Sequence, residues 1–207
     1  CKVRRIYSFF NNDPQFNFFR GFYRKVFEVF LAKLHHVDFL SETVRSRVRS
    51  FYDLSSKPYS VAPSSFVDPN GFDPAEDKKN WIVSLSRVVQ EKNIDLMIRA
   101  TRKFIDQVDQ APPGFQFLIL GKGPEEARLK KLILDLNLSN YIKIEYAALP
   151  QKYLRHSKIF FSLQNTDNYP SQSLMEAMLC ENAVIATQVG DTKKLVHADL
   201  GILVDFN

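Results

Sequence analysis

Short apolar runs alternate with helix-like stretches beyond residue 80. The runs are typical of strands buried on both faces of a sheet, and they cover residues 81–85, 115–120, 141–146, 159–163, 183–187 and 201–204. The stretches between them predict helices, at residues 93–108, 124–136, 150–156, 173–179 and 192–197. Six strands that alternate with helices predict an α/β fold built on a doubly wound parallel sheet.

A shorter set of elements precedes residue 66. Apolar residues recur at helical spacing over 19–34, with basic residues on the other side. Strands are predicted at 37–41 and 59–62, with a helix at 43–52 between them, whose inward positions are Val44, Val48 and Phe51. The helix over 19–34 is interpreted as one that covers a sheet. The alternative is a helix in a membrane interface, because aromatic and basic side chains share it.

Residues 66–80 separate the two sets and are rich in Pro, Gly, Asp and Lys, which is typical of a linker. We therefore predict the incomplete end of one domain over residues 1–65, a linker over 66–80, and a second domain over 81–207. The sequence starts at a cysteine and stops directly after a strand-like run. We expect it to be a fragment that is truncated at both ends.

The charge is uneven over the 207 residues. The net charge is +5, and residues 1–74 hold eleven Lys/Arg against seven Asp/Glu, which accounts for +4 of it. An anionic partner is compatible with this excess, but no nucleic-acid-binding motif is present. The two cysteines, Cys1 and Cys180, form neither a disulfide framework nor a zinc spacing, which favours a reducing compartment. No apolar run reaches membrane-spanning length.

Ligands of doubly wound sheets bind at the carboxyl ends of the strands, so the loops there are the candidate site. Arg87 and Lys92 follow the first strand of the second domain. Arginine offers a planar fork to phosphate oxygens, and lysine offers a point charge. Gly121 and Gly123 follow the next strand and let backbone N–H groups approach a ligand. A tight turn explains these two glycines equally well.

The stretch from 165 to 190 predicts a loop, a short helix and a buried strand. Ser173 and Glu176 have the S-x-x-E spacing of a capping box, which predicts that the helix begins there. The N–H groups at such a helix start, with the helix dipole behind them, form an anion site. Together with Arg87 and Lys92, this helix start predicts a crevice for a diphosphate.

Three segments together resemble one protein family, namely SLSRVVQEKNIDLMIRA, FLILGKGPEEARLKKL and FFSLQNTDNYPSQSLMEAMLCENAVIATQVGDTKKLV. In this order and spacing they are similar to the C-terminal, donor-binding domain of family 4 glycosyltransferases of GT-B type (group 1). VDFLSETVRSRV and VAPSSFVDPNGFDP resemble the end of the family's N-terminal, acceptor-side domain and its linker. The resemblance covers residues 37–204 and implies a GT-B fold, with the end of a second Rossmann-like domain before the linker.

The resemblance implies roles for individual residues. Arg87 and Lys92 would bind the donor's diphosphate, and Glu176 would hold the ribose hydroxyls. A loop would cradle the sugar and phosphate, and its residues here are Asp167, Asn168, Tyr169, Pro170, Ser171, Gln172 and Ser173. The sequence departs from the family pattern at Asn168, where a sugar-contacting Glu is typical and for which Asp167 could substitute. It also departs at Glu181, where Gly is usual, and at Lys194, near which an acid is often found.

The activity implied by the resemblance is sugar transfer from a nucleotide-diphosphate donor to a saccharide or lipid-linked acceptor, with retention, in polysaccharide or glycoconjugate synthesis. Neither a cofactor nor a metal is expected. The expected location is cytoplasmic, with peripheral association at the inner face of a membrane. The alternative is a non-catalytic module or inactive fragment that binds a nucleotide sugar. A Rossmann oxidoreductase is disfavoured because no G-x-G-x-x-G opens a helix after the first strand.

Overall fold

The computed structural model describes residues 6–9, 22–63 and 67–205. Its contacts divide the chain into two units. The first holds Cys1–Ser65 together with Asp167–Pro170, and the second holds Phe66–Thr166 together with Ser171–Asn207. Each unit has its own apolar core and is described by itself.

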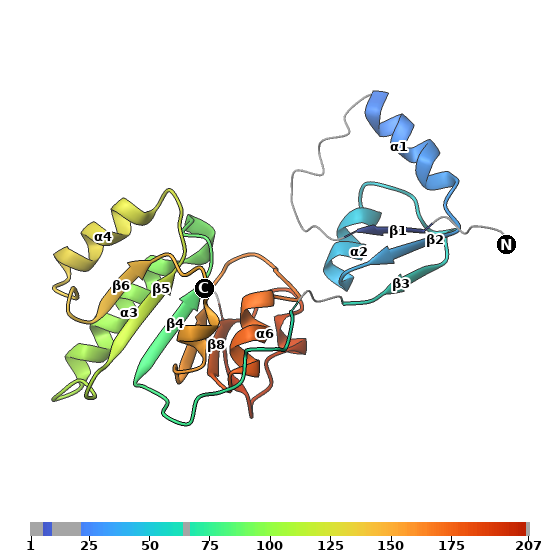
Figure 1. Ribbon diagram of the computed structural model, residues 1–207. Coiled ribbons are helices and arrows are strands. Elements are labelled where there is room, and N and C mark those ends of the chain that lie inside the picture. The colour runs from blue at the N-terminus through green and yellow to red at the C-terminus, as the bar shows by residue number, and fades with distance from the viewer. Residues whose placement is uncertain (1–5, 10–21, 64–66, 206–207) are drawn as a thin grey trace. The chain divides into compact units, whose positions relative to one another are not determined.

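The first unit is built on three parallel strands in the order β1-β2-β3 (Figure 1). Its elements are β1 (Ile6–Phe9), α1 (Phe22–Ala32), β2 (His36–Phe39), α2 (Glu42–Arg49) and β3 (Tyr59–Val61). Strand β1 was not predicted. The core is formed by Leu31, Leu34, Val37, Phe39, Val44, Val48, Tyr52 and Leu54. Since α1 and α2 both contribute to this core, they cover the sheet, as predicted for the described part of the first helix.

The predicted inward face of α2 is confirmed at two of three positions. Val44 and Val48 are buried, whereas Phe51 is 36% exposed. The helix ends at Arg49, so Phe51 no longer follows the helical spacing that placed it inward. On α1, Leu31 is buried while Val26 is exposed. The predicted helix residues before 22 lie outside the described residues.

The second unit confirms the predicted doubly wound sheet, with six parallel strands in the order β6-β5-β4-β7-β8-β9. The strands are β4 (Trp81–Leu85), β5 (Gln116–Leu120), β6 (Ile142–Glu145), β7 (Ile159–Ser162), β8 (Ala183–Thr187) and β9 (Gly201–Val204). The chain adds strands on one side of β4 and then on the other. The strand order therefore reverses between β4 and β7, which is where such sheets bind ligands.

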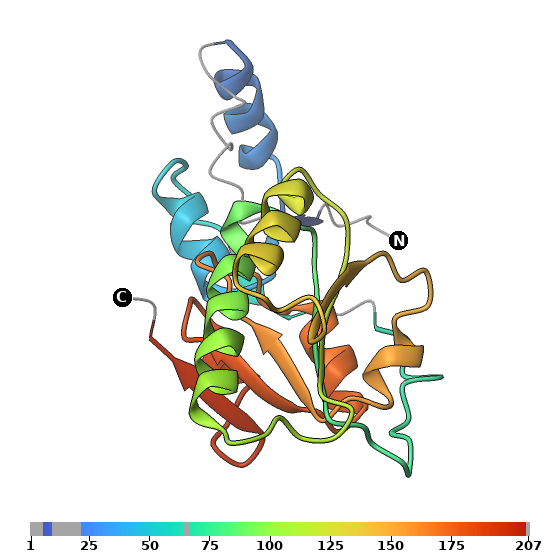
Figure 2. The same cartoon turned by 90° about the vertical axis from the view of Figure 1, so that its left-hand side faces the viewer.

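Helices cover both faces of this sheet. They are η2 (Gln90–Lys92), α3 (Ile94–Gln107), α4 (Glu126–Asp135), α5 (Gln151–Leu154), α6 (Gln172–Leu179) and η3 (Thr192–Lys194). Figure 2 shows α3 and α4 in front of the sheet. Strand β5 illustrates the layering, because Phe117 and Ile119 pack with α3 and α4, while Leu118 and Leu120 pack on the side of α5 and α6.

The helical piece predicted over 192–197 is shorter in the structure, which has a single 3₁₀ turn at Thr192–Lys194. One turn already brings Val196, 2% exposed, into the core. A longer helix is therefore not required for the burial of Val196.

The segment predicted as a linker lies against the second unit. Ala75 N donates to Arg155 O at 3.0 Å, and Arg155 Nε donates back to Asp73 O at 2.8 Å. Lys158 Nζ donates to Asn80 Oδ1 at 2.9 Å. Phe72 packs on the core beside α5 and α6. Residues 67–80 therefore belong to the second unit, where side chains hold them in place.

Candidate functional site

A shallow hollow, open to solvent, lies at the carboxyl ends of β4 and β7. Its position is the point at which the strand order reverses, where ligands of doubly wound sheets bind. The hollow has a polar lining from several elements of the second unit, formed by Ser84, Ser86, Lys92, Ser162, Gln164 and Ser173. This lining brings the predicted residues Lys92 and Ser173 together.

Lys92 places a positive charge in the hollow. Its Nζ donates to Gln164 Oε1 at 2.5 Å. Burial lowers the pKa of the Lys92 ammonium, and the charge of Arg87 acts in the same direction. Gln164 is 5% exposed, and its main-chain carbonyl accepts a hydrogen bond from Thr187 Oγ1, which holds the residue in place. Sequence reasoning missed Gln164, although a polar residue directly after a strand-like run was a usable signal.

The loop that carries Lys92 is pinned to the end of β7. Asn93, in the left-handed region with φ 49°, donates from its side chain to Leu163 O at 2.7 Å. Asn165 N donates to Glu91 O at 3.1 Å. These bonds on both sides of Lys92 fix where its side chain starts, so its charge is directed before any ligand binds.

Arg87 follows β4 at the same edge of the sheet and is exposed. Among the described residues, no hydrogen bond or ion pair engages its guanidinium. After burial, the charge of Arg87 is the second cause that lowers the pKa of Lys92. An exposed arginine and a half-buried lysine at one strand end form a cationic pair, and such a pair suits a diphosphate.

Gly121 and Gly123 have a packing role. A Cβ atom on Gly121 would lie 1.9 Å from Ser86 O, and one on Gly123 would lie 2.1 Å from Val88 O. Val88 N also donates to Lys122 O at 2.9 Å. The loops after β4 and β5 therefore approach so closely that side chains are excluded. A contact of these glycines with a donor stays a prediction.

The predicted capping box of α6 is wrong. The helix begins at Gln172, so Ser173 already lies in its first turn, and Ser171 holds the cap position without capping an N–H through its side chain. The carboxylate of Glu176 instead accepts from Gln172 Nε2 at 2.9 Å. Within the described chain, the first turn therefore has no serine cap, which agrees with an anion site there.

Glu176 is 7% exposed, and burial raises the pKa of its carboxyl group. The bond from Gln172 acts in the opposite direction and favours the charged form. This bond engages one carboxylate oxygen, Oε1, of the two that Glu176 carries. A ribose contact of Glu176 stays a prediction.

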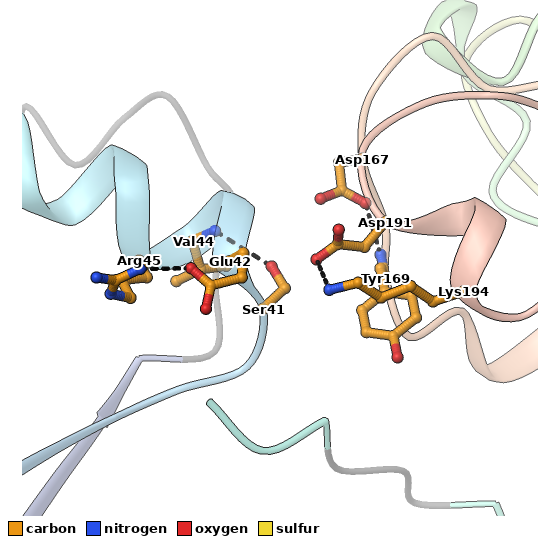
Figure 3. A network of polar contacts seen from close by, with 8 residues as sticks. All are labelled: Ser41, Glu42, Val44, Arg45, Asp167, Tyr169, Asp191 and Lys194. Carbon is orange, nitrogen blue, oxygen red and sulfur yellow. Dashed lines mark hydrogen bonds and ion pairs between the residues drawn. The ribbon is translucent and has the colours of Figure 1, made fainter. Parts of the chain in front are cut away.

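Residues Asp167–Pro170 are grouped with the first unit. Asp167 Oδ1 accepts from Tyr169 N at 3.1 Å, as Figure 3 shows, and the Tyr169-Pro170 peptide is cis. Asn168 is exposed. The roles of Asp167 and Asn168 toward a sugar stay predictions. In the second unit, Lys194 pairs with Asp191 at 3.1 Å, also drawn in Figure 3.

The described residues hold neither a group of metal-binding side chains nor a membrane-spanning helix. No three His, Cys, Asp or Glu side chains are grouped so that they could hold a metal ion within 6–9, 22–63 and 67–205. No helix in these ranges is long and apolar enough to cross a membrane.

Comparison with known proteins gives relatives that include two N-acetylglucosaminyltransferases and an exopolysaccharide phosphotransferase. The chain is 24% identical over 132 residues to the 2-deoxystreptamine N-acetyl-D-glucosaminyltransferase of Niallia circulans, covering 61% of this chain and 32% of that protein. It is 22% identical over 149 residues to the GtfA subunit of the UDP-N-acetylglucosamine–peptide N-acetylglucosaminyltransferase of Streptococcus agalactiae, covering 69% and 28%. The chain thus spans about a third of these two relatives.

Among solved structures, Anabaena HepE in complex with UDP has the same fold, with a TM-score of 0.76 at 18% identity. The match covers 98% of this chain and 58% of HepE. The sequence profile of the family described as Glycosyl transferases group 1 matches residues 70–207. This match spans the whole hollow and more than half of the sequence. The chain belongs to the glycosyl transferases group 1 family.

Proposed function

We propose that the second unit binds a nucleoside diphosphate sugar at the carboxyl ends of β4 and β7, and that the protein transfers this sugar to an acceptor. The observation that carries the proposal is the cationic pair, Arg87 and Lys92, at the same edge of the sheet as the uncapped start of α6. Charge of this kind matches a diphosphate. HepE was crystallised with UDP, which makes UDP the first probe.

Transfer breaks the bond between the anomeric carbon and the diphosphate oxygen, and the electron pair stays on that oxygen. Arg87, Lys92 and the N–H groups of the first turn of α6 stabilise the negative charge that develops there. The acceptor hydroxyl forms the new bond and passes its proton to the departing phosphate. The configuration at the anomeric carbon is retained, and the acceptor is a saccharide or a lipid-linked saccharide.

The remaining predicted residues complete the donor site. Glu176 binds the ribose hydroxyls with the oxygen that Gln172 leaves available. The loop from Asp167 to Ser173 contacts the sugar, and Asn168 can both donate to and accept from its hydroxyls. The loop held by Gly121 and Gly123 approaches the diphosphate through its backbone.

Arg87→Ala tests the proposal. Loss of the guanidinium should weaken UDP binding by about tenfold or more in calorimetry, while circular dichroism stays unchanged because Arg87 is exposed. Arg99→Ala is the matched control, because Arg99 is an exposed arginine on α3. Unchanged UDP affinity in Arg87→Ala would contradict the proposal. Binding of UDP-sugars without donor cleavage or transfer would support the alternative of a non-catalytic module.

A further inference from the structure

Lys78 joins the segment before β4 to the C-terminal end of α6. Its Nζ donates to three backbone carbonyls, those of Ser157 at 2.8 Å, Cys180 at 2.6 Å and Glu181 at 2.9 Å. These acceptors lie 79 to 103 residues away in the sequence. An ammonium group has three N–H donors, so each can serve one carbonyl.

The end of α6 needs such a partner. Glu181 N donates to Met178 O and Asn182 N donates to Ala177 O, which is the Schellman pattern. Glu181 therefore takes the left-handed conformation, with φ 54°, in which a non-glycine residue is strained. The pattern leaves the carbonyls of Cys180 and Glu181 to be satisfied, and the negative end of the helix dipole lies there. The Lys78 ammonium donates to both carbonyls and places a positive charge at the negative end of the helix dipole.

Burial of the Lys78 charge costs free energy, whereas the neighbouring Lys79 is exposed. Burial lowers the pKa of the Lys78 ammonium, so holding the charge there is unfavourable without its three acceptors. Lys79 is exposed, and its Nζ lies 4.5 Å from the centre of the Trp81 ring. Of these two adjacent lysines, Lys78 is directed to the helix end.

The turn that Lys78 holds is bonded to the candidate site. Cys180 N donates to Glu176 O at 3.2 Å, so the carbonyls of Cys180 and Glu176 lie one turn apart. Helix α6 has only eight residues. A displacement of its C-terminal end therefore moves Glu176 and the first turn with it.

We propose that Lys78 is a positioning residue for nucleotide binding, which fixes α6 from its C-terminal end and so holds Glu176 and the first-turn N–H groups in place. The inference rests on the proposed function of that helix. It assigns to residues 67–80 a part in donor binding, in addition to a connecting role.

The test compares Lys78→Met, Lys78→Arg and the control Lys79→Met in the 207-residue chain. Lys78→Met keeps an unbranched apolar side chain and removes the charge and donors. We expect it to weaken UDP binding in calorimetry by about tenfold and to speed amide exchange over residues 172–181. Lys78→Arg should restore much of the affinity, because a guanidinium still donates to carbonyls. Lys79→Met should bind UDP as the unmodified chain does.

The outcomes separate the two proposals. Lys78→Met that loses thermal stability but binds UDP with unchanged affinity would show that Lys78 only caps the helix, which would overturn the inference and leave the proposed function standing. Equal loss of affinity in Lys79→Met would also overturn it. If the unmodified chain binds no UDP, the proposed function fails, and the inference fails with it.

Discussion

At the scale of single residues, Lys92 shows a conflict between stability and binding. Its charge is partly removed from water, which costs folding free energy, and Gln164 Oε1 offsets part of that cost. We expect Lys92→Met to raise the free energy of unfolding by less than about 1 kcal/mol, since the hollow is open to solvent. The same variant should lose most of its UDP affinity. Urea denaturation and calorimetry on one preparation measure both effects, and a stability loss with intact binding would contradict the assignment.

The stability gain in Lys92→Met has a definite pH dependence. Because the folded-state pKa of Lys92 lies below its ordinary value, the unfolded chain binds more protons between that lowered pKa and about 10.4. The unmodified chain therefore gains stability as the pH rises through this window. The advantage of Lys92→Met should be full below the lowered pKa and should vanish toward pH 10. A pH-independent difference in urea midpoints would indicate another cause.

Residues differ in how far the sequence reveals them. Arg87 and Lys92 lie five positions apart after one strand, and this local spacing was enough to nominate both. Gln164 and Lys78 act through partners 72 or more residues away along the chain. A local pattern could have marked Gln164 as a polar residue after a strand-like run, but the partners of Gln164 and Lys78 become visible only when the fold brings them together.

At the scale of elements, two serines at helix starts allow a matched comparison. Ser41 Oγ accepts from Val44 N at 3.1 Å and caps α2, whereas Ser171, at the start of α6, caps no N–H through its side chain (Figure 3 shows Ser41). Both are buried. Ser41→Ala should cost about 1 kcal/mol, and Ser171→Ala less than about 0.5 kcal/mol.

Amide exchange resolved to α2 and α6 measures the two serine variants separately. Ser41→Ala should speed exchange in α2, and Ser171→Ala should leave exchange in α6 near that of the unmodified chain. A larger effect of Ser171→Ala on α6 would mean that its hydroxyl supports the helix after all. The uncapped first turn proposed as an anion site would then be lost.

The elements that were predicted well carry strong periodic signals. The bounds of β4, β8 and β9 agree with the prediction, because these strands are short apolar runs between clear breaks. The capping box failed for a physical reason. Gln172 lies four residues before Glu176, so the two side chains face each other on the helix. Glu176 accepts a hydrogen bond from Gln172 and does not act as the capping partner of Ser173. Strand β1 lies in an aromatic-rich stretch without a clear break, so its run did not stand out.

At the scale of the whole molecule, the doubly wound parallel sheet of the second unit followed from general rules. Parallel strands buried on both faces, with a helix in each connection, leave few arrangements other than the doubly wound one. The division at residues 66–80 was visible in composition, but its attachment to the second unit was not. That attachment depends on specific bonds from Lys78, Arg155 and Lys158.

The separate cores of the two units lead to a prediction about ligand-linked stability. A ligand stabilises only what its site needs folded, and UDP at 100 times its dissociation constant adds about 2.7 kcal/mol. Since the cationic pair and α6 lie in the second unit, UDP should slow amide exchange in β4, β5, β7 and β8. Exchange in β2 and β3, which pack in the other core, should stay unchanged. Equal protection of the strands of the two units would contradict this prediction. It would mean that UDP binds elsewhere or that the two units unfold as one cooperative unit. Arg87→Ala provides the reference, because a tenfold loss of affinity leaves the same UDP concentration at about ten times the dissociation constant and lowers the added stability to about 1.4 kcal/mol. The protection of these strands should therefore fall by about half or more.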